Sequence, residues 1–145
     1  MIDAPTRDAL SAIIRRESLS MLSYVGDAYP WTTARGHHAL DRLQKIVRTH
    51  REAVVALGRF LVRRQVPLPY IGNFPSNFTT INFLSLDYLI PKLIESEKQS
   101  IADLERDLRS IHHGEARAEV EKLLAVKREH LKQLEALAPL PQAAV

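Results

Sequence analysis

Four stretches of the sequence carry apolar residues three and four positions apart, and turn-forming Gly and Pro residues separate them. This spacing predicts α-helices over about residues 6–25, 33–65, 84–112 and 115–137, each with one apolar stripe. Thr6 is expected to cap the start of the first helix, and Gly114 the end of the third. Such stripes must be buried against one another. The sequence therefore predicts an all-α protein, with one four-helix bundle domain over residues 1–138 and a frayed tail over 139–145.

A long apolar segment separates the second predicted helix from the third. Residues 66–83 are far more than an antiparallel neighbour needs for its turn, and three of the four phenylalanines lie between Phe74 and Phe83. Fifteen extended residues can span about 50 Å, the length of a whole bundle. We therefore expect a crossover that returns along the outside of the helices, with its aromatic residues packed on them.

Composition restricts the chemistry that such a bundle can perform. The chain of 145 residues has no cysteine, so a metal ion would have to be held by His, Asp or Glu. No stretch is long and apolar enough to span a membrane, and the first residues lack the order of a signal peptide, so we expect a cytoplasmic protein. The net charge of +3 comes from basic residues interleaved with acidic ones, and nucleic acid is not an expected partner.

Each predicted helix places an ionisable residue on its apolar stripe. The first carries Glu17, the second His50, the third Glu97, and the fourth both Lys127 and His130. His50 follows Glu17 by 33 residues, and His130 follows Glu97 by the same number. The two helical hairpins therefore present the same pair at the same relative positions. Because unpartnered buried carboxylates cost several kcal/mol, a metal ion or a cationic side chain must compensate them.

At these residues the chain resembles the ferritin-like superfamily. That superfamily builds a di-metal site from one Glu on each of two helices and a Glu-x-x-His pair on each of the others, with a long crossover between the hairpins. The resemblance implies that Glu17, Glu97, His50 and His130 are metal ligands, and that Tyr24, seven residues after Glu17, lies near the metal. The positions of the two bridging glutamates hold Val47 and Lys127 instead. The resemblance therefore implies the fold and a degenerate site more strongly than ferroxidase or oxygen-activating chemistry.

Two interpretations of this site remain open. In the first, Glu17, His50, Glu97 and His130 bind one divalent ion such as iron, zinc or manganese. In the second, which we favour, there is no cofactor, and Lys127 places its ammonium between Glu17 and Glu97.

The function that follows is a ferritin-like structural or interaction module whose central metal site has degenerated. The alternative is a ferritin-like oxidoreductase or iron-handling protein that uses the four ligands. The resemblance also implies a homodimer.

Overall fold

The computed structural model describes residues 2–138, and within this range the protein is all-helical, with no β-strand. The predicted tail, residues 139–145, lies outside the described residues. Five α-helices and two short 3-10 helices follow one another along the chain: α1 (Ala4–Ser18), α2 (Met21–Val25), η1 (Ala34–Gly36), α3 (His37–Arg63), η2 (Ser76–Ile81), α4 (Leu86–Leu108) and α5 (Gly114–Leu137). Among the described residues, no helix combines the length and the apolarity needed to cross a membrane.

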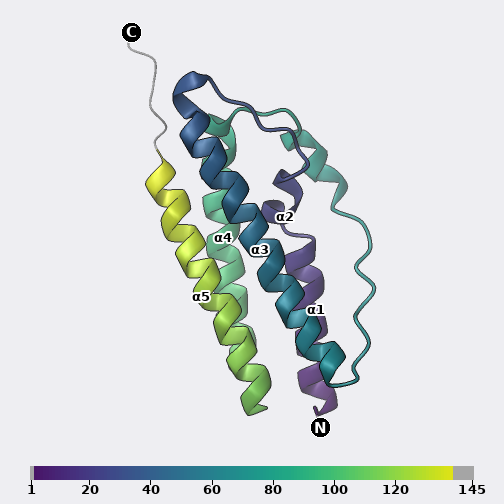
Figure 1. Ribbon diagram of the computed structural model, residues 1–145. Helices are drawn as coiled ribbons and strands as arrows, with labels where there is room; N and C mark the ends of the chain where they lie inside the picture. Colours follow the sequence, from purple (N-terminus) through teal and green to yellow (C-terminus); the bar gives the residue numbers. More distant parts are fainter. Residues whose placement is uncertain (1, 139–145) are drawn as a thin grey trace.

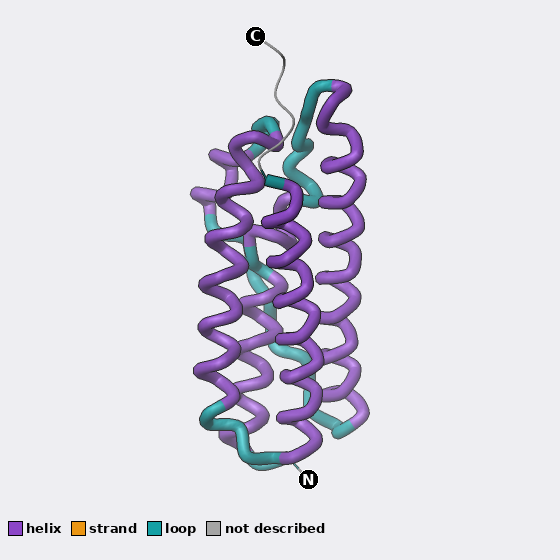
Figure 2. The backbone as a smooth tube through the Cα atoms, turned by 90° about the vertical axis from the view of Figure 1, so that its left-hand side faces the viewer, coloured by secondary structure: helices purple, strands orange, loops and turns teal. Residues whose placement is uncertain are grey.

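The four long helices lie side by side (Figure 1). Helices α1 and α5 run upward in that view, whereas α3 and α4 run downward. Each of the pairs α1 with α3 and α4 with α5 is therefore antiparallel. The tube in Figure 2 shows the same rods from the side, with loops at both ends.

The first predicted helix is wrong as a single element, because the chain breaks it after Ser18 and starts α2 at Met21. Ser20 has extended backbone angles, and its hydroxyl accepts a hydrogen bond from the backbone N–H of Ser23 at 3.3 Å. A serine in this position is a preferred N-cap. The start also differs from prediction, since Asp3, not Thr6, caps α1 and accepts from the Thr6 N–H at 3.2 Å.

The junction between the last two helices also differs from prediction. Gly114 is the first residue of α5, and the preceding His113 caps that helix through Nδ1, which accepts the N–H of Ala116 at 3.2 Å. Helix α4 ends earlier, at Leu108. Arg117 donates to the carbonyl oxygens of Leu108 and Ile111, so a side chain satisfies the helix end that the sequence had assigned to glycine.

The crossover between α3 and α4 comprises residues 64–85, and it travels from the lower end of α3 to the upper start of α4 (Figure 1). Part of it packs as expected: Phe74 and Phe78 contact the ring of Tyr24 with centroids 5.1 and 5.5 Å apart. Other apolar residues remain in solvent, with Tyr70 81% and Leu68 55% exposed. The crossover is thus a partly packed strap along the bundle.

The upper end of the crossover is tied to the loop between α2 and α3. Phe83 N–H donates to Ala28 O at 2.8 Å, and Trp31 exchanges backbone hydrogen bonds with Leu84 and Leu86. Tyr29 and Phe83 both have positive φ angles, 51° and 61°, and their rings stack 5.6 Å apart. These contacts hold two bulky residues in a backbone conformation that they rarely adopt.

The buried core consists of two apolar clusters, which together take residues from every long helix. The lower cluster lies where α1 and α5 begin, and the upper cluster lies where α3 and α4 begin. The lower cluster includes Leu10, Ile13, Leu57, Leu61, Leu104 and Leu124; the upper includes Leu22, Leu43, Ile46, Leu89, Leu93 and Leu134. A layer of buried polar side chains lies along the helices between them: Glu17, Ser23, His50, Glu97, Ser100, Lys127 and His130. We call these residues the polar layer.

Candidate functional site

Lys127 is the centre of the polar layer. Its side chain is fully buried, and its Nζ lies 2.5 Å from Glu17 Oε1 and 2.9 Å from Glu97 Oε1. The ammonium donates a hydrogen bond to Glu97 Oε1. One cation from α5 therefore joins a carboxylate from α1 to a carboxylate from α4.

The two carboxylates have different surroundings. Glu17 Oε2 accepts a hydrogen bond from Ser100 Oγ at 2.6 Å, and Arg16 Nε lies 3.8 Å from the same oxygen. Glu97 has Lys127 as its partner, and its Oε2 is buried without a hydrogen bond.

Because of this difference, the pKa values of the two carboxyl groups shift in opposite directions. Burial raises the pKa of Glu17, but attraction to Lys127 and the hydrogen bonds it receives outweigh burial, so the pKa lies below its usual value. Burial raises the pKa of Glu97, and here Lys127 only partly offsets it, while the neighbouring charge of Glu17 adds to the rise. The layer therefore holds Glu17 as a carboxylate more firmly than it holds Glu97.

His50 is fixed by the break between α1 and α2. Its Nε2 lies 3.1 Å from the carbonyl oxygen of Glu17 and 2.9 Å from Ser23 Oγ, while that hydroxyl donates to the same carbonyl at 2.8 Å. Because the helix stops after Ser18, the Glu17 carbonyl oxygen can accept these side-chain bonds in addition to a 3.4 Å bond from the Ser20 N–H. Nε2 is therefore assigned as the protonated nitrogen, which leaves Nδ1 of His50 buried without a partner.

His130 has no such anchor. Its ring is buried, its Nδ1 has no hydrogen-bond partner, and it lines a groove of about 460 Å³ between α3 and α5 together with Arg42 and Lys45. Burial and then repulsion by Lys127 lower the pKa of both His50 and His130 to about 4. Both imidazoles are thus neutral at pH 7.

The donor set in this arrangement does not fit a metal ion. The ammonium of Lys127 lies against both carboxylates, in the space that an ion bound by them would need. Among residues 2–138, no three His, Asp or Glu side chains lie close enough together to hold an ion. The one positive charge of Lys127 therefore lies where a metal bound by both carboxylates would lie, and it offsets part of their negative charge.

The structure brings together most of the residues singled out in the sequence. Glu17, His50, Glu97, Lys127 and His130 are all at most 3% exposed and share one layer. Tyr24 is the exception, since its hydroxyl donates to Asn82 of the crossover at 2.6 Å and its ring contacts Phe74 and Phe78. The Tyr24 hydroxyl is thus bonded to the crossover, and its expected position near a metal stays a prediction.

Sequence reasoning missed the hydroxyl groups of the layer. Ser23 bonds His50 and the Glu17 carbonyl, and Ser100 bonds the Glu17 carboxylate. A signal was present, because Ser100 lies three residues after Glu97 on the same helical stripe, one turn from a charged group.

Comparison with known proteins gives no match: no protein-family model, no curated protein and no solved structure is similar to this chain.

Proposed function

We propose that this protein is a ferritin-like helical bundle in which the central metal site has been replaced by an internal ion-pair network, and that it acts as a structural or interaction module. The observation that carries the proposal is the contact of Lys127 Nζ with Glu17 and Glu97, at 2.5 and 2.9 Å. A cation at that point contacts the two carboxylates that would be metal ligands in the superfamily, although it supplies one positive charge where two metal ions would supply at least four.

Three further features support the kinship. Helices α1 with α3 and α4 with α5 form two antiparallel pairs joined by a long crossover, the connectivity found in ferritin-like folds. The Glu and His of each pair lie in one buried layer. The position that would hold a bridging glutamate on α5 is the one that holds Lys127.

A module of this kind works through its surface, while the polar layer fixes its shape. A homodimer formed through outer helix faces belongs to the same proposal. Sedimentation velocity over a range of protein concentrations tests it, and a monomer at all concentrations would contradict the dimer.

The proposal as a whole is tested by metal binding to protein purified without a histidine tag. We expect dialysis against Fe(II) without oxygen, and against Zn(II) or Mn(II), to leave less than one tenth of an equivalent on the wild type. Val47→Glu combined with Lys127→Glu restores both bridging carboxylates, and this variant should bind iron. Lys132→Glu with Thr49→Glu, which adds the same charges at exposed positions of the same helices, is the control.

The results separate two ideas. Failure of the double variant to bind iron, although it folds, would contradict the ferritin-like kinship. One equivalent of metal on the wild type, lost in His50→Ala with His130→Ala, would contradict the charge-paired site.

A metal-binding ferritin-like oxidoreductase or iron-handling protein is the second candidate. It is favoured by the free lone pairs of the layer: His50 Nδ1, His130 Nδ1 and Glu97 Oε2 are buried without partners. Metal binding would require Lys127 to leave the layer, because its ammonium and a metal ion repel each other.

A further inference from the structure

A groove of about 470 Å³ lies where the crossover runs back along α1 and α3. Its walls are aliphatic: Ile14 comes from α1, Val54, Val55 and Val62 come from α3, and Leu68 and Ile71 come from the crossover. Val55, Val62 and Leu68 are each at least half exposed, at 50, 55 and 55%. The protein therefore leaves a continuous aliphatic surface open to solvent along its side.

The charged residues that line this groove are all positive. Arg59 and Arg63 lie one helical turn apart on α3, and no acidic residue joins them in the lining. Neither arginine forms an ion pair with any residue of the described range 2–138. Their neighbour Arg64, by contrast, pairs with Glu115. An apolar groove with two uncompensated guanidinium groups is complementary to a ligand that has an apolar body and one anionic group.

The size of the groove selects a thin ligand. Small-molecule sites typically have volumes of about 300–1,000 Å³, and this groove lies in the lower half of that range. An α-helix is about 10 Å across, so a single turn of a partner helix would fill the space. An extended aliphatic chain is far thinner, and it could run lengthwise between the crossover and the two helices.

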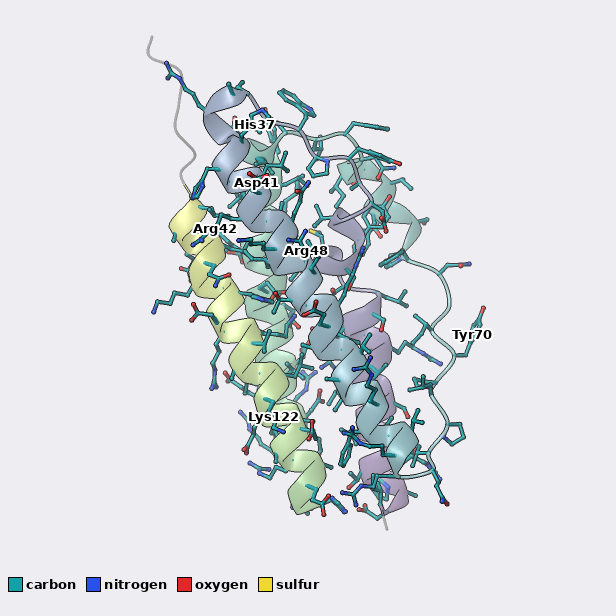
Figure 3. All side chains as sticks on the ribbon, in the orientation of Figure 1. His37, Asp41, Arg42, Arg48, Tyr70 and Lys122 are labelled. Atoms are coloured by element: carbon teal, nitrogen blue, oxygen red, sulfur yellow. The ribbon has the colours of Figure 1, made fainter. Side chains whose placement is uncertain are left out.

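The crossover is held in place over the groove. Arg15 Nε donates to the carbonyl oxygen of Tyr70 at 2.9 Å, and Val66 N–H donates to Leu61 O at 3.0 Å. Gly58 allows Leu68 to lie close to α3, because a Cβ at that position would be 3.2 Å from Leu68 Cδ2. Tyr70 projects outward from the crossover, away from the helices (Figure 3).

We propose that this groove binds a long-chain aliphatic carboxylate, a fatty acid, with its chain along the valines of α3 and its carboxylate at Arg59 and Arg63. This goes beyond the function proposed above, and it rests on a separate surface, since Glu17, Glu97 and Lys127 do not line the groove. A fatty-acid site would explain why the crossover keeps apolar residues such as Leu68 exposed, which packing against the helices does not explain.

The test is calorimetric titration of the full chain with octanoate, decanoate and dodecanoate below their micelle concentrations. Because each buried methylene adds a constant increment, each added pair should tighten the dissociation constant by roughly fourfold to fifteenfold. 1-Decanol has the same chain without the charge, and it should bind about tenfold more weakly than decanoate at low salt. High salt should reduce that difference.

Two pairs of variants locate the site. Val55→Glu places a carboxylate on the groove wall and should abolish binding of dodecanoate, whereas Ala56→Glu at the adjacent exposed position should not. Arg59→Gln with Arg63→Gln should weaken decanoate by about tenfold and leave 1-decanol unchanged. Arg48→Gln, on the same helix and labelled in Figure 3, is the control for lost positive charge.

Three outcomes would overturn the proposal. The first is no heat and no displaced fluorescent fatty acid with the wild type at submicellar dodecanoate. The second is equal affinity for decanoate and 1-decanol, unchanged in the Arg59→Gln with Arg63→Gln variant. The third is a stable dimer that Val55→Glu dissociates, since a second copy of the chain would then cover the groove.

Discussion

The two antiparallel helix pairs each bury a Glu and a His that lie 33 positions apart in the sequence, but the two environments differ. In α1 and α3, the helix breaks after Ser18, and the buried Glu17 carbonyl oxygen accepts a hydrogen bond from Ser23 and lies 3.1 Å from His50 Nε2. In α4 and α5, both helices continue, Glu97 pairs with Lys127, and His130 Nδ1 has no partner. Equal spacing along the sequence therefore does not produce equal environments. What differs is the number of hydrogen-bonding groups that each carboxylate and each imidazole finds.

Removing the shared cation should have the largest effect, because both pairs depend on it. Lys127→Met leaves the buried Glu97 without its cation and Glu17 with only the more distant Arg16, and we expect a loss of roughly 3 kcal/mol in the free energy of unfolding. Urea denaturation at pH 7 measures it, with Lys132→Met at an exposed position of α5 as the control. Adding Glu17→Gln and Glu97→Gln to Lys127→Met should recover most of the loss. A wild-type midpoint for Lys127→Met would contradict the ion-pair network.

Acid should weaken both pairs through their histidines. Each pKa is about 4 in the folded protein against an ordinary 6.5, so below pH 6.5 the unfolded chain binds protons that the folded one does not. The histidine contribution is complete above pH 6.5 and is lost as the pH falls towards 4. The loss amounts to at most about 3 kcal/mol per histidine.

Denaturation midpoints between pH 7 and 4 measure this dependence. His50→Gln with His130→Gln should flatten it, and the double variant removes no other titrating group. Glu97 acts in the opposite sense, because its raised pKa lets the folded state keep a proton more readily as the pH falls. A stability difference between the wild type and the double variant that stays constant from pH 6.5 to 4.5 would contradict the lowered pKa of the two histidines.

Replacing one carboxylate at a time should produce a smaller loss of stability, and the loss should differ between the two helix pairs. Glu17→Gln weakens the contact with Lys127 and a charge-assisted bond from Ser100, and we expect a cost of about 2 kcal/mol at pH 7. Glu97→Gln should cost less than about 1 kcal/mol, because burial already raises the pKa of this group. The cost of Glu97→Gln should shrink further as the pH rises, since ionisation of Glu97 costs the folded state more than the unfolded one. Equal losses in the free energy of unfolding for the two variants would contradict the different environments of Glu17 and Glu97.

The smallest difference is expected between the histidines at pH 7. His50→Gln disrupts a bonded ring and should cost about 1 to 1.5 kcal/mol, whereas His130→Gln removes a ring whose Nδ1 makes no bond and should cost about half as much. Thermal melts resolve such a difference. A larger cost for His130 would indicate a partner for its Nδ1 in solution.

The sequence predicted the helices because their apolar stripes are long and regular, and it predicted the buried ionisable residues because they interrupt those stripes. It could not predict the break after Ser18. Leu19 and Ser20 follow without Gly or Pro, and although serine is favoured at N-caps, it is also tolerated at exposed positions inside a helix, so Ser20 alone does not predict a break. The prediction that Gly114 caps the end of the third helix was wrong. The side chain of Arg117, three residues later, instead donates to the carbonyl oxygens at the end of α4.

Whether Lys127 faces inward also lay beyond the stripe pattern. A lysine on an apolar stripe can extend its ammonium to the surface, and only the positions of Glu17 and Glu97 on other helices decide between the two outcomes. The direction of Tyr24 depended on Asn82 and on two phenylalanines of the crossover, 50 to 58 residues away. Such contacts depend on tertiary structure, and spacing within one helix carries no information about them.

The polar layer, which divides the core into two apolar clusters, also fixes how the helices align lengthwise. Aliphatic residues make up nearly all of both apolar clusters, so a helix that shifted by one turn would still bury aliphatic side chains against aliphatic side chains. A slip of α5 by one turn, about 5.4 Å, would instead carry the Lys127 ammonium away from both carboxylates and into a hydrocarbon environment. The ion pair therefore selects one lengthwise alignment of the helices out of several that apolar packing alone would allow.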